Sequence, residues 1–414
     1  MANRHTVIVG GGIVGLSSAY FLARRGERVT VVERDTPGRG ASSGNAGILA
    51  LGHPPLPHPN AFRQIRRLLF RKTNPLYIAP RADPELLRWL WSFRRACARE
   101  RFEHSMELLA RMGWAAGECI RRLVADEGID CEYSPSGWLE VFRTRQAMDR
   151  ARRTADLLRR HGYTVTALDG DALRQREPAF RDEVVGAMHY EDSAFAHPAK
   201  LMVGLADRVR KLGVDFLTEA EVVRITLRSS RFTGVELADG QRIDADRAVL
   251  AAGAWTTPLA RSIGVRVPMQ AGKGYHLELR ATAHRPSTTC VLAETFVAVT
   301  PLDGGLRLAG TVELAGLDLT LNRRRLAMLP RGAADYLRGI DRAELGGSWC
   351  GLRPMTADGL PVLGWAPGVE GVFVATGHAM MGFLLGPLSG KLVAEAIVDG
   401  RMSLDAPELA PARF

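Results

Sequence analysis

The sequence predicts a mixed α/β fold with more than one domain. Its 414 residues exceed the usual length of a single domain. Strand, glycine-rich loop and helix follow one another at both ends of the chain, over residues 5–25 and 372–397. Between them, residues 272–279 and 289–310 alternate apolar and polar side chains, as antiparallel strands with one buried face do. We therefore expect a Rossmann-like sheet and a second, antiparallel sheet with helices.

The first unit carries a dinucleotide-binding signature. Residues 5–9 (HTVIV) read as a buried strand, a G-x-G-x-x-G run follows, and residues 16–25 read as a helix. The first glycine of such a run permits a tight turn, the second lets the backbone approach a pyrophosphate, and the third lets helix and strand pack closely. The helix N-terminus then offers N–H groups to the phosphates. The run comprises Gly10, Gly11, Gly12, Ile13, Val14 and Gly15.

The second strand, over residues 28–32, ends at an acidic residue, Glu33. A carboxylate at this place accepts hydrogen bonds from an adenosine ribose. The neighbouring Arg34 would suit a 2′-phosphate, but Glu33 would repel one, so FAD or NAD is favoured over NADP. A run of small residues over 40–47 follows. Its hydroxyl groups, on Ser42 and Ser43, would bond phosphate oxygens, although a flexible loop has a similar composition.

The charge of the chain is concentrated in one segment. The net charge is +10, and residues 60–104 alone contribute +7, together with several aromatic residues in a helical pattern. This segment is either a basic surface for an anionic membrane or a helix pair with core tryptophans and solvated arginines. Arginines elsewhere are scattered without a nucleic-acid-binding motif, so no nucleic-acid partner is expected.

Cysteines and uncharged runs indicate the compartment. The five cysteines have neither disulfide-framework nor metal-site spacing, so we expect no metal and a cytoplasmic location. The uncharged stretch 7–23 contains the glycine motif and is not interpreted as a signal peptide. The run 372–390 contains a histidine, a proline and several glycines, which argue against a membrane span.

The middle of the chain alternates helices and strands. Helices are predicted over 60–104, 107–128, 146–161 and 198–212, and a hairpin over 232–243. The strand 248–252 (AVLAA), followed by Gly253, fits another edge of the nucleotide-binding sheet. Near the end, WCGLRPMT (349–356) and DGLPVLG (358–364) precede the strand 372–375, the loop 376–382 and a last helix. The N-terminus of this helix would stabilise an anionic reduced flavin.

These motifs together resemble one family. The segments GGGIVGLSSAYFLARRG, VVERD, GNAG, GLRPMTADGLPVLG and ATGHAMMG are similar to those of the D-amino acid dehydrogenases, D-hydroxyproline dehydrogenases among them. These belong to the wider D-amino acid oxidase and glycine oxidase superfamily of FAD enzymes. The resemblance implies an FAD-binding domain of discontinuous segments, 1–60, 185–268 and 350–414. It implies a substrate domain over 61–184 and 269–349.

The resemblance also assigns site residues. It implies that Arg353 holds a substrate carboxylate, and a planar guanidinium suits this because it pairs bidentately. Tyr275 falls on a substrate-domain strand and is expected to line the pocket, with His53 and His276 as weaker candidates. The FAD site is expected to comprise Gly10, Gly12, Ile13, Val14, Gly15, Glu33, Arg34, Ser42, Ser43, Asn45, Ala46, Gly47, Val222, Gly377, His378, Met380, Met381 and Gly382.

The activity implied is oxidation of the Cα–N bond of a D-amino or D-imino acid by hydride transfer to flavin N5. Met380 and Met381 stand where the family commonly has smaller or polar residues, which indicates an altered pocket and argues against D-alanine as the best substrate. The expected substrates are small and neutral or proline-like, such as D-proline or cis-4-hydroxy-D-proline. The basic segment 60–104 favours a quinone or other electron-transfer acceptor and peripheral contact with the inner membrane. Two alternatives remain: a glycine or sarcosine oxidase that uses oxygen, and a flavin-binding sensor or non-catalytic subunit.

Overall fold

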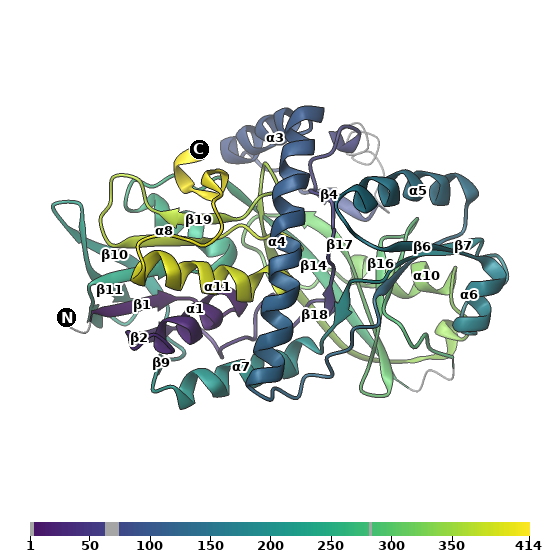
Figure 1. The fold of residues 1–414 in the computed structure, drawn as a ribbon, viewed down its shortest axis with the longest axis horizontal. Helices are drawn as coiled ribbons and strands as arrows, with labels where there is room; N and C mark the ends of the chain where they lie inside the picture. Colours follow the sequence, from purple (N-terminus) through teal and green to yellow (C-terminus); the bar gives the residue numbers. More distant parts are fainter. Residues whose placement is uncertain (1–3, 63–73, 281–283) are drawn as a thin grey trace.

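The computed structural model describes residues 4–62, 74–280 and 284–414. Figure 1 shows two sheet regions side by side, with the long helix α4 (Arg99–Asp126) crossing between them. The first region contains both ends of the described chain, and the second is formed largely by the middle of the sequence. None of the helices in the described ranges has the length and hydropathy that a bilayer crossing requires.

The first region is built on a six-stranded sheet with the order β19-β20-β13-β1-β2-β9. Its strands are parallel except β19, which runs antiparallel to β20. Such a sheet needs helices on its faces, because parallel strands are joined by crossover connections. The strands are β1 (His5–Val9), β2 (Arg28–Val32), β9 (Asp215–Leu217), β13 (Arg247–Leu250), β19 (Val362–Trp365) and β20 (Val372–Thr376).

Two helices pack closely against this sheet. Helix α1 (Ile13–Ala23) crosses α11 (Gly382–Val398), and α11 in turn contacts α4. A side chain at Gly390 would put its Cβ within 2.5 Å of Ser17 atoms, so the glycine permits the close crossing. An antiparallel sheet of β10 (Val222–Arg228), β11 (Arg231–Leu237) and β12 (Arg242–Asp244) flanks the region, with α7 (Pro198–Lys211) and α8 (Thr256–Arg261).

The second region is built on a nine-stranded sheet with the order β18-β14-β17-β16-β15-β5-β7-β6, and β4 pairs with β17. All neighbours are antiparallel except β15 with β5 and β17 with β4. The strands are β4 (Leu76–Ile78), β5 (Trp138–Phe142), β6 (Val165–Asp169), β7 (Gly186–Tyr190), β14 (Met269–Arg280), β15 (Cys290–Leu292), β16 (Val297–Leu302), β17 (Gly305–Leu314) and β18 (Glu344–Thr356).

Shorter elements complete this region. One face of the sheet packs against α10 (Met328–Ala334) and the residues after it, through a cluster that includes Leu308, Leu329 and Tyr336. The remaining elements are β3 (Ile48–Leu49), β8 (Ala194–Phe195), α3 (Pro84–Ala96), α5 (Arg145–Arg160), α6 (Gly170–Arg176), α9 (Arg323–Leu326) and α10 (Met328–Ala334).

Several predicted elements differ from the structure. Strand β13 lies inside the parallel sheet, between β1 and β20, rather than at an edge, because its residues are apolar on both faces. The segment predicted as helical over 60–104 contains strand β4, and residues 63–73 lie outside the described ranges. The predicted helix 107–128 is the second part of α4, which starts at Arg99.

Two strands do not fit the predicted division into domains. Strand β7 follows the boundary at 185 but pairs with β5 and β6 of the nine-stranded sheet. Strand β18 spans the boundary at 350 and pairs along most of its length with β14. The division stays a prediction, and these pairings favour placing both strands with the substrate domain.

Candidate active site

A single cavity of about 970 Å³ runs from the edge of the parallel sheet to the face of the nine-stranded sheet. Among the predicted site residues, those along its wall are Gly10, Gly12, Ile13, Val14, Glu33, Arg34, Ser42, Asn45, Ala46, His53, Val222, Tyr275, Arg353, His378, Met380 and Gly382. Those outside its wall are Gly15, Ser43, Gly47, His276, Gly377 and Met381. The cavity therefore collects most of the candidates, although they come from distant parts of the sequence.

At one end of the cavity the chain makes the glycine turn between β1 and α1. Gly10 has φ +108°, and a Cβ there would lie 2.6 Å from the carbonyl oxygen of Ala251. A Cβ at Gly15 would lie 1.9 Å from the carbonyl oxygen of Gly10. Glycine is thus required at both places, and the turn presents bare backbone to the cavity.

Glu33 organises this turn from the end of β2. Its carboxylate accepts hydrogen bonds from the backbone N–H groups of Gly11 (2.7 Å) and Asp35 (3.0 Å). Next to it, the guanidinium of Arg34 stacks over the ring of Trp255, 3.6 Å from its centre. Val222 lies on the same part of the wall, at the start of β10. A carboxylate, a flat cation–π pair and an apolar valine make a suitable environment for an adenosine moiety.

The loop 40–47 lies over the N-terminus of α1. The hydroxyl oxygen of Ser42 accepts a hydrogen bond from the backbone N–H of Ile13, 2.9 Å away. Ser43 turns away from the cavity, and its hydroxyl donates to the carbonyl of Arg39 (3.0 Å). Ser42 is therefore placed at the N-terminus of α1, an end that suits a phosphate group, whereas Ser43 stabilises the loop.

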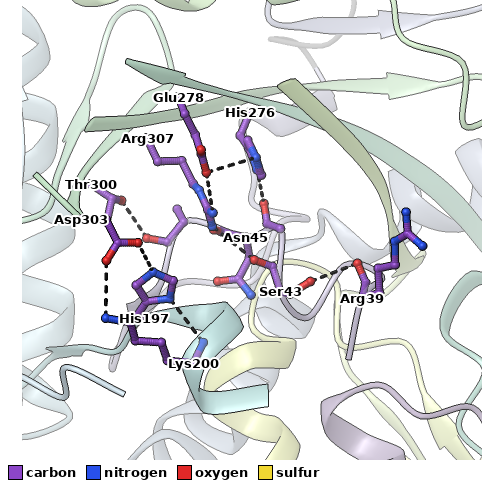
Figure 2. Close-up of polar contacts among 12 residues, drawn as sticks. Arg39, Ser43, Asn45, His197, Lys200, His276, Glu278, Thr300, Asp303 and Arg307 are labelled. Carbon is purple, nitrogen blue, oxygen red and sulfur yellow. Dashed lines mark hydrogen bonds and ion pairs between the residues drawn. The ribbon is translucent and has the colours of Figure 1, made fainter. Parts of the chain in front are cut away.

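Side chains of the nine-stranded sheet hold this loop in place (Figure 2). Arg307 donates to the carbonyls of Ser43 (3.2 Å) and Asn45 (2.9 Å), and Thr300 donates to the carbonyl of Ala46 (2.7 Å). These bonds join the two sheet regions directly alongside the cavity.

His276 also contacts the loop 40–47. Its Nδ1 lies 2.8 Å from the carbonyl oxygen of Gly44, and its ring stacks on Trp349. Burial lowers the pKa of His276 to about 4, so the ring is neutral at ordinary pH. The predicted pocket role of His276 does not match its position, which lies outside the cavity wall. His53 does line the cavity, and burial lowers its pKa.

The loop before α11 closes another side of the cavity. His378 is buried, shares a hydrogen bond of 2.7 Å with the hydroxyl of Ser389, and has a pKa lowered by burial to about 4. Met380 and Gly382 reach the cavity wall, while Met381 caps α11 and packs against the core. The N-terminus of α11 therefore faces the cavity, as the sequence predicts.

Arg353 lies where β18 passes under the cavity. Its Nη1 donates to the carbonyl oxygen of Thr311 at 3.2 Å, and among the described residues it has no acidic partner. Burial lowers its pKa to about 10, which leaves the group charged at neutral pH. Part of its side chain stays accessible, and the cavity is the space that it faces. Even partial burial of a guanidinium is costly when it has no anionic partner.

Tyr275 contributes to the cavity wall but uses its hydroxyl elsewhere. The hydroxyl donates to a carboxylate oxygen of Glu313 at 2.6 Å, and Arg325 lies 3.6 Å from the same carboxylate. The side chain is 1% exposed, and burial raises its pKa. The ring of Tyr275 can therefore line the pocket, whereas its hydroxyl is already hydrogen-bonded to Glu313.

Sequence reasoning missed several cavity residues. The guanidinium of Arg353 lies close to Gly274, although the residue directly opposite Gly274 on β18 is Gly351. Glu140 lies on the distant strand β5, and both Gly274 and Glu140 line the cavity. Helix α3 contributes Trp89, Leu90 and Phe93. The alternating glycines of AGKG were a usable signal for close approach in a strand, but only the sheet register shows what approaches Gly274.

One cluster outside the cavity has metal-ligating residue types. Glu132, His197 and Asp303 lie close together, and Figure 2 shows the ammonium of Lys200 beside Asp303. Lys200 contacts both carboxylates, 3.4 Å from Asp303. A cation of the chain itself thus already offsets one of the two negative charges of this cluster.

The comparisons with known proteins agree with this geometry. Residues 5–396 match the family described as FAD dependent oxidoreductase. The chain belongs to this family. A D-amino acid dehydrogenase of Methylobacterium radiotolerans is 34% identical, with 98% of this chain and 97% of the relative covered. That of Methylobacterium nodulans is 33% identical, with 99% and 98% covered.

Solved structures share the fold. A glycine oxidase from Geobacillus kaustophilus superimposes with a TM-score of 0.80 at 25% identity, covering 99% of both chains. An L-proline dehydrogenase from P. horikoshii gives a TM-score of 0.77 at 19% identity, covering 100% of this chain and 98% of the other. The fold predicted from the sequence is therefore confirmed, and the protein is an FAD-dependent oxidoreductase.

The cavity fits FAD in its chemistry as well. The glycine turn, Ser42 and the α1 N-terminus suit the pyrophosphate, and Glu33 suits a ribose. From there the cavity continues without interruption to the face of the nine-stranded sheet, where the α11 N-terminus and Arg353 meet it.

Proposed function

We propose that this protein oxidises the Cα–N bond of D-amino or D-imino acids that are small and neutral or proline-like, such as D-proline or cis-4-hydroxy-D-proline. Bound FAD supplies the hydride acceptor. The substrate loses a hydride from Cα and a proton from nitrogen and becomes an imine, which water hydrolyses to a keto acid and ammonia. A proline-like substrate instead yields a cyclic imine. The full-length similarity to relatives named D-amino acid dehydrogenase supports this proposal.

Arg353 is the observation that carries the proposal. Its guanidinium is charged and partly buried, faces the cavity, and has no acidic partner among the described residues. A substrate carboxylate would supply the missing partner through two parallel hydrogen bonds. This pairing fixes the orientation of the neighbouring Cα–H bond, so that much of the catalysis is positioning.

The wall beside Arg353 favours an uncharged side chain. Trp89, Leu90 and Phe93 of α3 line the cavity, together with Leu76 and Ile78 of β4. Transfer of a charged side chain to such surroundings is unfavourable. An aliphatic or ring substrate meets no such penalty, which supports the neutral or proline-like class.

We also propose that electrons leave for a quinone or another electron-transfer acceptor at a membrane surface. The outer face of α3 exposes Leu87 (68%) and Trp91 (59%). Arg94, Arg95 and Arg101 surround Trp91 in a shallow pocket. An apolar face with a cationic rim suits an anionic bilayer interface.

Vesicle flotation tests this contact. Wild type should float with vesicles that contain phosphatidylglycerol at low salt, and Trp91→Ser should reduce the floated fraction severalfold. Trp365→Ser is a matched control, since Trp365 is 42% exposed on β19. If both variants floated to the same extent as wild type, α3 would not be part of the membrane contact.

The substrate is tested by anaerobic bleaching of the bound flavin with a panel of D- and L-amino and imino acids. The proposal expects bleaching by D-proline-like or small neutral D-amino acids and none by their L-enantiomers. The structural similarity to glycine oxidases favours one second candidate, an oxidase. Rapid reoxidation of the reduced flavin in air would support the oxidase, and slow reoxidation the dehydrogenase. A chain that no member bleaches would be a flavin-binding sensor or subunit.

A further inference from the structure

Four directly opposed residues form a row across the nine-stranded sheet. Ala309 pairs with Ala298, Ala298 with Val291, and Val291 with Glu140. All four line the cavity. Because directly opposed residues point to the same face of a sheet, the row forms a floor. Neighbouring strands lie about 4.8 Å apart, so the floor runs roughly 14 Å from β17 to β5.

The loop after Asn45 lies over the same face of the sheet and also bounds the cavity. Thr300 and Arg307, each two residues along their strands from the row, bind the backbone of this loop at Ala46 and Asn45. Ala46 and, further along, Ile48 and Ala50 then line the same cavity. The space beside the row is therefore bounded by small or aliphatic side chains on two sides. Such a space suits a flat, aromatic ring system.

The row ends in a carboxyl group. The hydroxyl of Tyr190 donates to one carboxyl oxygen of Glu140 at 2.7 Å, and Trp138 stacks on Tyr190 with ring centres 4.2 Å apart. The second carboxyl oxygen of Glu140 has no partner among the described residues. Like Arg353, Glu140 lies deep in the protein but keeps accessible surface toward the cavity. Its low-polarity surroundings raise its pKa.

We propose that the row from Ala309 to Glu140 is the slot for the flavin ring, and that Glu140 accepts a hydrogen bond from the N3–H edge of that ring. The isoalloxazine is apolar along its faces and carries an N–H donor at one end, which complements an apolar floor closed by an acceptor. The other end of the row adjoins Thr311, whose carbonyl binds Arg353. The assignment depends on FAD and not on which substrate is oxidised.

An acidic group at the edge of the ring also affects the midpoint potential of the flavin. Reduced flavin gains negative charge, and a carboxyl with its acceptor oxygen toward the ring disfavours that charge. Glu140 should therefore keep the midpoint potential lower than a neutral amide would. The Tyr190 hydroxyl and the Trp138 ring fix the carboxyl, so they are positioning residues.

The test compares Glu140→Gln with Glu127→Gln. Glu127 also accepts a hydrogen bond from a tyrosine, Tyr20, but lies outside the cavity wall. For Glu140→Gln we expect the FAD dissociation constant to rise about tenfold and the absorption bands of bound flavin to shift. The midpoint potential should rise by about 30 mV, which is a tenfold change for a two-electron couple. Glu127→Gln should match wild type in all three.

A second variant tests the floor. Ala298→Leu adds bulk in the middle of the row and should lower FAD occupancy severalfold, with the circular dichroism spectrum unchanged. If Ala298→Leu bound FAD as tightly as wild type, the proposal that the row binds the flavin ring would be wrong, even if Glu140→Gln failed to fold. If Glu140→Gln left the FAD dissociation constant and the flavin midpoint potential unchanged, or changed substrate affinity alone, the proposed role of Glu140 would be wrong. None of these readouts requires turnover, so they stand apart from the proposed substrate.

Discussion

Gly274 controls the position of Arg353, and Gly274→Ala should displace it. A Cβ built on Gly274 lies 2.0 Å from Nη1, 2.5 Å from Cζ and 2.6 Å from Nη2 of Arg353. Carbon and nitrogen atoms cannot approach so closely, so the guanidinium must move by about 1 Å or more. It is the flexible end of a side chain, so the fold should survive while the hydrogen bond to the Thr311 carbonyl is lost.

The expected magnitude follows from the bonds that Arg353 would make to a carboxylate. Loss of one charged hydrogen bond costs about 1.5–3 kcal/mol, which corresponds to roughly 10- to 150-fold in kcat/KM. A misplacement of 1 Å can alone cost about 100-fold. We therefore expect kcat/KM for an amino acid substrate to fall about 10- to 150-fold, with unchanged FAD content.

Anaerobic stopped-flow reduction measures this effect, because it separates substrate affinity from the rate of flavin reduction. Gly347→Ala is the matched control, since the nearest atom to a Cβ there lies 3.6 Å away. Wild-type reduction kinetics in a folded, FAD-loaded Gly274→Ala protein would refute the role of Arg353 in holding the carboxylate.

Three further predictions follow from the same geometry. Arg353→Lys keeps the charge but loses the planar fork, so substrate affinity in flavin titrations should fall about tenfold or more; unchanged affinity would argue against bidentate pairing. Gly10→Ala forces a strained φ and a contact with the Ala251 carbonyl, so thermal unfolding should show a loss of about 1–3 kcal/mol together with weaker FAD binding. His276 and His378 have pKa values near 4 in the fold against 6.5 for a free histidine, so the unfolded chain binds more protons between pH 6.5 and 4. Stability should fall as the pH drops through this window, and His378→Gln should weaken that dependence in urea titrations; an identical slope in the variant would contradict it.

The nucleotide end of the site was predictable because its parts are contiguous. Strand, glycine turn, helix and acidic strand end all lie between His5 and Glu33, and each has a local steric or hydrogen-bonding reason. In the structure the carboxylate of Glu33 accepts a hydrogen bond from the backbone N–H of Gly11 in the glycine turn. Arg353 was assigned through the resemblance, and in the structure it lines the cavity and has no acidic partner among the described residues.

The substrate end was less predictable because it depends on sheet register. Gly274 meets Arg353 only through the pairing of β14 with β18, and Glu140 reaches the floor only through the pairing of β5 with β15. Local periodicity fixes neither pairing. The direction of the Tyr275 hydroxyl has a similar cause: the register of β14 and β17 shifts beside Tyr275, and Thr311 in that bulge adopts φ +60°.

Arg353 and Glu140 share a property that links stability to function. Both are polar groups deep in the protein, each with bonding capacity that no described residue fills. Burying such groups is unfavourable without a partner, so the fold keeps them at a cost. If FAD meets Glu140 and a carboxylate meets Arg353, the two ligands should stabilise the protein separately. A ligand at 100 times its dissociation constant adds about 2.7 kcal/mol. Replacing one group, with a tenfold rise in the dissociation constant of its own ligand, should then reduce the stabilisation by that ligand by about 1.3 kcal/mol and leave the stabilisation by the other ligand unchanged.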